Sequence, residues 1–172
     1  MSVVESIKKA TSTAFSFEIL PPLKGNGLDS VMNTIDILRE FDPKYINITT
    51  HRSERVQEWN ADGSSKVVSL RRRPGTVAVA AAIHHKYNIP VVPHILCGGF
   101  TREETEYVLI DLQFLGITDL LLLRGDKAVE EKYYLPTSGG NAHANNGGLK
   151  DLLVDGKMLK VVEQHIHKVL KV

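Results

Sequence analysis

The sequence has one cysteine, no long apolar run and almost no net charge, and each shortage argues against a class of protein. Cys97 stands alone among 172 residues, so an intrachain disulfide framework is excluded and a reducing cytoplasm is the expected location. No apolar run reaches membrane-spanning length, and Met1–Ala10 lacks the apolar core of a signal peptide. With 21 basic and 20 acidic residues, the formal charge of +1 gives no reason to expect a nucleic acid or a membrane as a partner.

Two motifs that carry chemistry are also missing. No Gly-x-Gly-x-x-Gly follows a predicted strand, which argues against a Rossmann dinucleotide site. His51, His94 and His143 do not have the spacing of zinc ligands, so no metal is expected. What is present, with 42% hydrophobic and 24% charged residues, is typical of one globular domain over residues 1–172.

Four short segments rich in apolar residues predict four β-strands, at residues 14–20, 45–50, 89–96 and 118–123. The last contains Leu120–Leu123, and such a run suits a strand that is covered on both faces, as in a parallel sheet.

Helical patterns separate these strands. Asp29 is predicted to cap the first helix, the alanine-rich Val77–Tyr87 forms the second, and the third begins at a capping box of Thr101 and Glu104 and stops at Gly116. The order β-α-β-α-β-α-β implies right-handed crossovers and a parallel α/β sheet.

Three segments lie outside this alternation. The long polar stretch 51–65 is interpreted as a working loop or lid. Arg71–Arg73 suits a solvated loop at least as well as an anion site. Met158–Val172 has apolar residues at helical spacing and is predicted to form a terminal helix, with a hairpin turning at Asp155-Gly156 as the competing interpretation.

Polar residues follow all four predicted strands: Glu18, Thr49-Thr50, His94 and Arg124-Gly125-Asp126. The carboxyl ends of parallel strands converge at one edge, where α/β proteins build their sites. Arg124 and Asp126 could instead pair with each other in a surface turn. Four such groups in register favour a site.

Glu18 is the most specific member of this set. Its neighbours Phe17, Ile19 and Leu20 are apolar and two prolines follow, so partial desolvation is expected. Desolvation would raise the pKa of Glu18 and make it a general acid near neutral pH. The alternative is a structural carboxylate that accepts hydrogen bonds from backbone amides.

Four motifs, in order, resemble one family. "FSFEILPP" at Phe15–Pro22 is similar to the "SFEFFPP" opening of methylenetetrahydrofolate reductases, and Ile48–Thr50, Val92–Ile95 and Leu121–Asp126 resemble their "VT", "PHLT" and "LRGD" segments. The resemblance runs from about Thr13 to Ala144. It implies that residues 13–146 form the first half of a TIM (β/α)₈ barrel, with four strands, and that 147–172 is a divergent tail.

The resemblance also implies a reaction and a set of roles. Hydride would pass from NAD(P)H through FAD to methylenetetrahydrofolate. Glu18 would be the acid that opens the folate's imidazolidine ring, and Asp126 would lie near the flavin and hold the pterin. The remaining implied cofactor contacts are Thr49 near the nicotinamide, and Thr50, His94, Arg124, Gly125 and Ala144 toward FAD.

The chain departs from the family pattern after Asp126. The family's barrel has eight strands and four are found here, while the later "YPE" and "QFFFD" segments have no counterpart. The alternative is therefore a non-enzymatic half-barrel that acts as a folded subunit or interaction module. Because a half-barrel leaves strand edges open, a homo-oligomer is expected, most simply a two-fold dimer.

Overall fold

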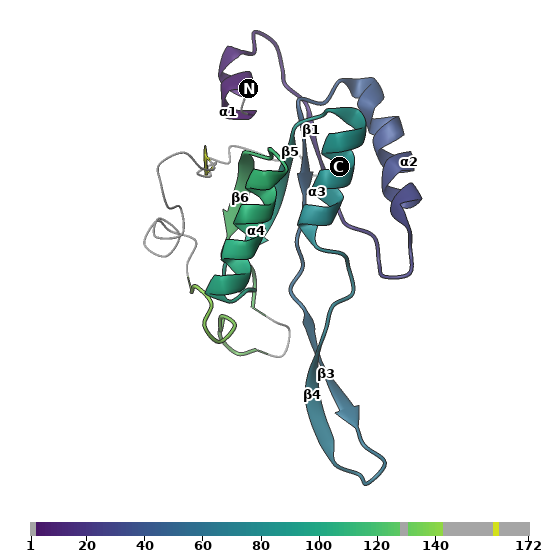
Figure 1. The fold of residues 1–172 in the computed structure, drawn as a ribbon, viewed down its shortest axis with the longest axis vertical. Coiled ribbons are helices and arrows are strands. Elements are labelled where there is room, and N and C mark those ends of the chain that lie inside the picture. Colours follow the sequence, from purple (N-terminus) through teal and green to yellow (C-terminus); the bar gives the residue numbers. More distant parts are fainter. Residues whose placement is uncertain (1–2, 128–130, 143–159, 162–172) are drawn as a thin grey trace.

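A computed structural model of the chain describes residues 3–127, 131–142 and 160–161. Its centre is a parallel sheet with strand order β1-β2-β5-β6-β7 (Figure 1). The strands are β1 Ser16–Ile19, β2 Tyr45–Ile48, β5 Val91–Leu96, β6 Asp119–Leu123 and β7 Lys160–Val161. The predicted α/β fold with four parallel strands is confirmed, and the sheet does not close into a barrel within the described residues, as a half-barrel requires.

The predicted helices are also present: α2 Leu28–Leu38, α3 Thr76–Tyr87 and α4 Arg102–Phe114, with an additional short α1 at Val3–Lys9. The capping box of α4 is confirmed, because the Glu104 amide donates to the Thr101 hydroxyl at 3.1 Å and the Thr101 amide donates to Glu104 Oε2 at 2.9 Å. The prediction that Asp29 caps α2 is wrong: Gly27 is the N-cap, and Asp29 lies in the first helical turn. No helix in the described ranges is long and apolar enough to cross a membrane.

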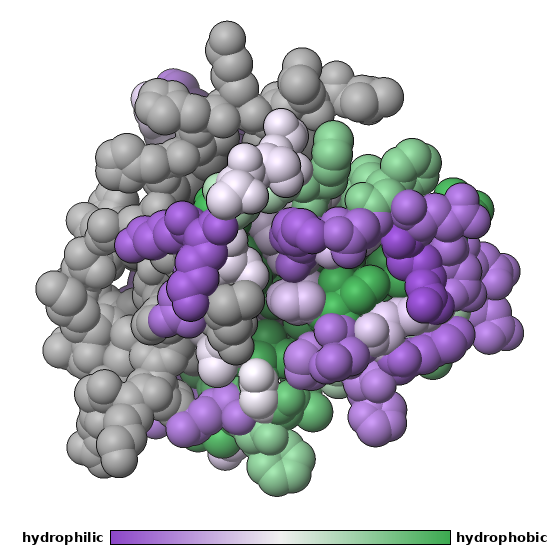
Figure 2. Space-filling view, turned by 90° about the horizontal axis from the view of Figure 1, so that it is seen from above, coloured by the Kyte–Doolittle hydropathy of each residue, from purple (hydrophilic) through white to green (hydrophobic). Residues whose placement is uncertain are grey.

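Helices α2, α3 and α4 cover one face of the sheet. Alternate strand residues point into this layer and are buried there: Ile19, Ile46, Ile48, Val91, Ile95 and Leu120. In the view from above, hydrophobic residues gather in the middle of the molecule (Figure 2). Two-sided burial, expected for Leu120–Leu123, occurs instead in β5, whose six residues are all buried. The last three leucines of β6 are half-buried, and β7 pairs only with its first two residues.

The polar stretch after β2 is an antiparallel hairpin rather than an irregular loop. Strands β3 (Glu54–Trp59) and β4 (Ser65–Leu70) pair along their whole length and project from the body (Figure 1). Gly63, with φ of +83°, closes the turn between them. The prediction missed these strands because their polar residues interrupt the apolar alternation that marks a half-buried strand.

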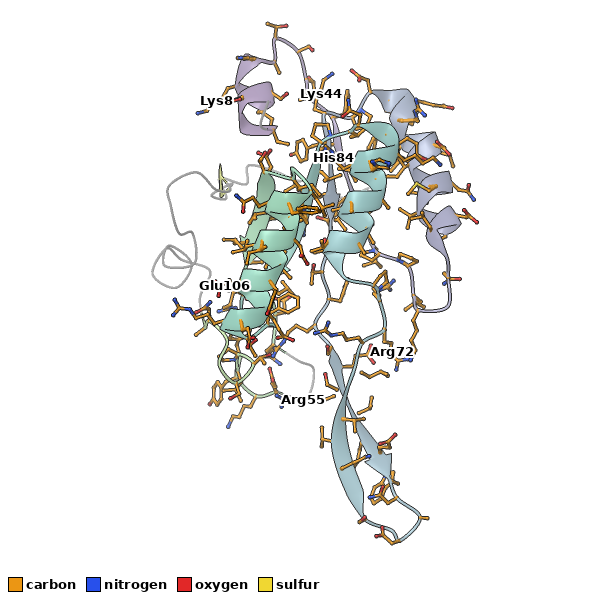
Figure 3. All side chains as sticks on the ribbon, in the orientation of Figure 1. Lys8, Lys44, Arg55, Arg72, His84 and Glu106 are labelled. Atoms are coloured by element: carbon orange, nitrogen blue, oxygen red, sulfur yellow. The ribbon has the colours of Figure 1, made fainter. Side chains whose placement is uncertain are left out.

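Three arginines make contacts at the base of this hairpin; one of them, Arg72, is labelled in Figure 3. Arg71 contacts Glu104 at 3.4 Å, Arg72 contacts Glu54 at 2.7 Å, and Arg73 donates to the Pro21 carbonyl. Arg71 and Arg72 are exposed in the loop that follows β4, as the interpretation as a solvated loop predicts, and the contacts of the three arginines connect this loop to β3, to the β1 exit and to α4.

Lys160–Val161 pair in parallel with Asp119–Leu120. The prediction of a helix over Met158–Val172 is therefore wrong at these two residues, where a sheet edge offers backbone partners. The rest of that segment, and the competing turn at Asp155-Gly156, lie outside the described residues.

Candidate functional site

The candidate site lies on the sheet face that α2, α3 and α4 leave uncovered. Strand register places Glu18 beside Asn47 and Asn47 beside Val92, and His94 follows two residues later on the same face of β5. Near β1 this face is open, since Ser16, Glu18 and Leu20 are all exposed. Side chains that are 29 to 76 positions apart in the sequence are thus brought to one edge by parallel pairing.

Glu18 is exposed, so the expected desolvation is not found. The reason is the strand alternation itself: Ile19 is buried and Phe17 half-buried on the opposite face, where they pack against the helices instead of surrounding the carboxylate. The structural alternative is not supported either, because the Glu18 carboxylate has no hydrogen-bond partner within the part of the chain that the structure describes.

His94 is the buried member of the site, with 5% of its surface exposed. Its Nε2 lies 3.4 Å from Asn47 Oδ1. Burial lowers the pKa of His94 below its ordinary value of 6.5, and the negative charge of Glu18 opposes this shift in part. Burial therefore favours the neutral imidazole of His94.

The two threonines after β2 connect neighbouring strands. The Thr49 amide and hydroxyl both donate to the Ile19 carbonyl, at 3.1 and 3.3 Å, and the Thr50 hydroxyl donates to the His94 carbonyl at 2.5 Å. Both hydroxyl protons are thus used within the protein, and only the oxygen lone pairs remain free to meet a ligand.

The Arg124-Gly125-Asp126 turn follows β6 at the same edge. Gly125 has φ of +87°, a conformation that other residues rarely adopt. Arg124 and Asp126 are exposed and form no ion pair with each other in the described structure. Instead the Arg124 guanidinium lies 4.8 Å from the centroid of the Tyr134 ring. The interpretation as a self-paired surface turn is therefore not supported.

The structure thus groups Glu18 with His94 and places Thr49 and Thr50 beside them, whereas the Arg124 turn lies beyond β5, with Gly125 packed near Leu96. Ala144 and His143 lie outside the described residues. Among those described, no three His, Cys, Asp or Glu side chains are close enough together to hold a metal.

Sequence reasoning missed three residues that shape this edge: Asn47, Arg52 and Tyr134. Asn47 had a usable signal, because it alternates with Thr49 on the strand face that carries Glu18. Arg52 followed a strand end, but nothing indicated its partners. Tyr134 gave no signal, since it follows a turn whose path depends on tertiary contacts.

A parallel α/β sheet with one helix-covered face and polar residues toward the carboxyl ends of its strands is the arrangement of half an α/β barrel. The family model described as methylenetetrahydrofolate reductase matches residues 3–146, so the chain belongs to that family. The resemblance inferred from the four motifs is thereby confirmed.

Named relatives agree. A "Methylenetetrahydrofolate reductase (NADH) 1" of Arabidopsis thaliana is 28% identical over 147 residues, which cover 84% of this chain and 22% of the relative. A "5,10-methylenetetrahydrofolate reductase" of Salmonella typhimurium is 27% identical over 111 residues, which cover 64% of this chain and 32% of the relative. The chain therefore spans between about a fifth and a third of the length of these relatives.

Proposed function

We propose that this chain provides the β1–β6 portion of a site that reduces 5,10-methylenetetrahydrofolate to 5-methyltetrahydrofolate, in one-carbon metabolism in the cytoplasm. The observation that carries the proposal is the register of β1, β2 and β5, which brings Glu18 and the buried His94 to one face of the sheet with Asn47 between them. Bound FAD would supply the hydride relay from NAD(P)H. Three plant relatives have NADH in their names, so NADH is the first reductant to test.

The donor set at this edge fits a flavin cofactor in part. Arg124 offers an exposed guanidinium suited to phosphate, and Gly125 presents backbone without a side chain. Thr49 is half-buried and retains its oxygen lone pairs. His94 and Thr50 would act differently. His94 is buried and the Thr50 hydroxyl donates to its carbonyl, so these two residues would support the site without contacting the cofactor directly. Ala144 stays a prediction.

In this proposal Glu18 and Asp126 act on the folate. The carboxylic acid form of Glu18 would give its proton to a nitrogen of the imidazolidine ring, the O–H bond breaking as the N–H bond forms, while the ring's C–N bond opens. The exposed Asp126 carboxylate would accept hydrogen bonds from the pterin.

The test separates the two half-reactions. The purified protein is expected to take up FAD, show a flavin spectrum and oxidise NADH with menadione as acceptor. Glu18→Gln should lower folate reduction by about 10²–10⁴-fold, as expected for loss of a general acid, and leave flavin reduction by NADH unchanged. Glu106→Gln, an exposed change on α4 (Figure 3), is the matched control. Equal loss of both half-reactions in Glu18→Gln would refute its role.

A non-enzymatic half-barrel, acting as a folded subunit or interaction module, is the second candidate. It is favoured by the open face itself, because Leu20 is an apolar side chain with 49% of its surface exposed at the place where a substrate pocket should be enclosed. Isothermal titration with FAD and with folate distinguishes the two. Micromolar binding of either ligand would argue against this candidate.

We also propose a homo-oligomer. Strand β1 lies at one edge of the sheet, and at the other β7 covers only Asp119–Leu120, which leaves Leu121–Leu123 without a strand partner on that side among the described residues. Such edges favour association. Light scattering over a dilution series is expected to show a dimer, and a cooperatively melting monomer at micromolar concentration would contradict it.

A further inference from the structure

Residues 131–142 lie against the loop that follows β5. The Thr137 amide donates to the Gly98 carbonyl at 2.8 Å, and the Asn141 amide donates to the Cys97 carbonyl at 3.1 Å. From the other side, the Arg102 amide donates to the Gly139 carbonyl at 3.0 Å. The chain after the Arg124 turn is therefore returned to the same edge of the sheet that carries the candidate site.

Arg52, just after β2, reaches across to this returning segment. Its Nη2 donates to the Leu135 carbonyl at 3.0 Å, and its Nη1 donates to the Asp126 carbonyl at 3.3 Å. The same Nη1 lies 3.5 Å from Glu131 Oε2, and the two side chains are only 18% and 9% exposed. The Arg52 guanidinium thus connects the end of β2 both with Asp126 in the turn and with the returning segment, at Glu131 and Leu135.

Tyr134 connects the same arginine to the turn. The guanidinium carbons of Arg52 and Arg124 lie 5.6 and 4.8 Å from the centroid of its ring, and its hydroxyl donates to the Arg124 carbonyl at 2.8 Å. Room for that hydroxyl depends on Gly98, where an added Cβ would lie 1.4 Å from it. Burial raises the pKa of Tyr134, which keeps the phenol protonated as a donor.

We propose that Arg52 and Tyr134 form a latch that fixes the Arg124-Gly125-Asp126 turn, and that Arg52 is thereby a positioning residue for the site. The contacts converge on that turn: two of its three carbonyls accept hydrogen bonds from the latch, and its guanidinium stacks on the latch's ring. A turn held in this way presents Arg124 to a ligand without the entropy cost of ordering it on binding.

The latch rests on geometry alone, whereas its effect on cofactor binding rests on the proposed function. Arg52→Lys keeps the positive charge and removes the planar fork that reaches several acceptors at once. Tyr134→Phe keeps the ring and removes only the hydrogen bond to Arg124. Arg55→Lys is the matched control, because Arg55 is exposed on β3 and makes none of these contacts.

Two measurements test the proposal. Hydrogen exchange should quicken by about tenfold in peptides that cover 124–127 and 131–142 of Arg52→Lys, with β2 and α3 unchanged. The dissociation constant for FAD should rise by about tenfold, with a smaller rise in Tyr134→Phe and none in Arg55→Lys. Exchange equal to that of the unmodified protein, or faster exchange throughout the sheet, would overturn the latch.

The two proposals fail in different ways. If the unmodified protein binds no FAD, the proposed function falls, and hydrogen exchange alone decides the latch. If exchange quickens locally in Arg52→Lys while the FAD affinity stays unchanged, Arg52 holds the segment but does not position the site, and the positioning role is overturned.

Discussion

The two faces of the central sheet are built from alternate residues of the same strands, yet they have opposite properties. On the helix-covered face Ile46, Ile95 and Leu120 are completely buried. On the open face Ser16, Glu18 and Leu20 are exposed. Side chains on the helix-covered face therefore stabilise the fold by their burial, whereas those near β1 on the open face are accessible to a ligand. This separation follows from the two-residue period of a strand.

The contrast ends at β5, where Val92, His94 and Leu96 belong to the open face by register yet are as well buried as the helix-covered residues. His94 is the polar member of this set. It is therefore the residue at which stability and site chemistry depend on each other.

The largest effect is expected from neighbouring substitutions that fall on opposite faces. Ile46→Ala should lower the free energy of unfolding by about 2–5 kcal/mol, because it leaves a cavity among fully buried side chains. Asn47→Ala should lower it by about 1 kcal/mol or less, since it removes one long hydrogen bond to His94. Urea denaturation measures both. Equal losses would show that the faces do not differ in this way.

A smaller effect is expected from the helix that covers the closed face. Thr101→Ala removes the N-terminal cap of α4 and should lower the free energy of unfolding by about 1 kcal/mol. Thr11→Ala, at an exposed position before β1, is the control and should change nothing measurable. If the two substitutions have the same effect on urea denaturation, the capping box does not contribute to stability.

His94 should make stability pH-dependent. Its pKa in the folded protein lies below the ordinary 6.5, so between these two values the unfolded chain binds more protons. The contribution of neutral His94 to the free energy of unfolding is fully present above about pH 6.5, and it is lost as the pH falls toward the pKa of His94 in the folded protein.

Titration of unfolding between about pH 5 and 7 should therefore show a steeper loss for the unmodified protein than for His94→Gln. Parallel curves for the two proteins would mean that His94 does not cause the pH dependence of stability.

The smallest effect is expected at Leu20. Although it is apolar, it is half-exposed on the open face, so Leu20→Gln should change the free energy of unfolding by less than about 0.5 kcal/mol. Thermal melting is sufficient to test this. A large loss would show that the open face is covered there, as it would be across a dimer interface.

The fold was largely predictable from the sequence because it depends on local periodicity. Alternation and apolar runs located four strands, and Thr101 with Glu104 located the start of α4. The sequence placed Glu18 and His94 at strand ends, and in the structure both lie within the second half of their strands, before the last residue. It misjudged the surroundings of Glu18, because flanking apolar residues on a strand face away from it.

The contacts that shape the site could not be read in this way. Arg52 meets Leu135 across 83 positions, and nothing in the local pattern of either segment indicates the other. The β3–β4 hairpin was missed for a related reason: pairs such as Glu58 and Lys66, 3.0 Å apart, stabilise a strand only once its partner is opposite.

The hairpin also bears on the order in which the chain folds. Within it Asn60 donates to Ser64 across 4 positions and Gln57 to Ser65 across 8, whereas Thr49 reaches Ile19 across 30 positions and His94 reaches Asn47 across 47. Hairpins close in about 1–10 μs, and contacts of high sequence separation form more slowly. The projecting arm should therefore form before the central sheet, and the candidate site, which needs β1, β2 and β5 together, should be among the last parts to form.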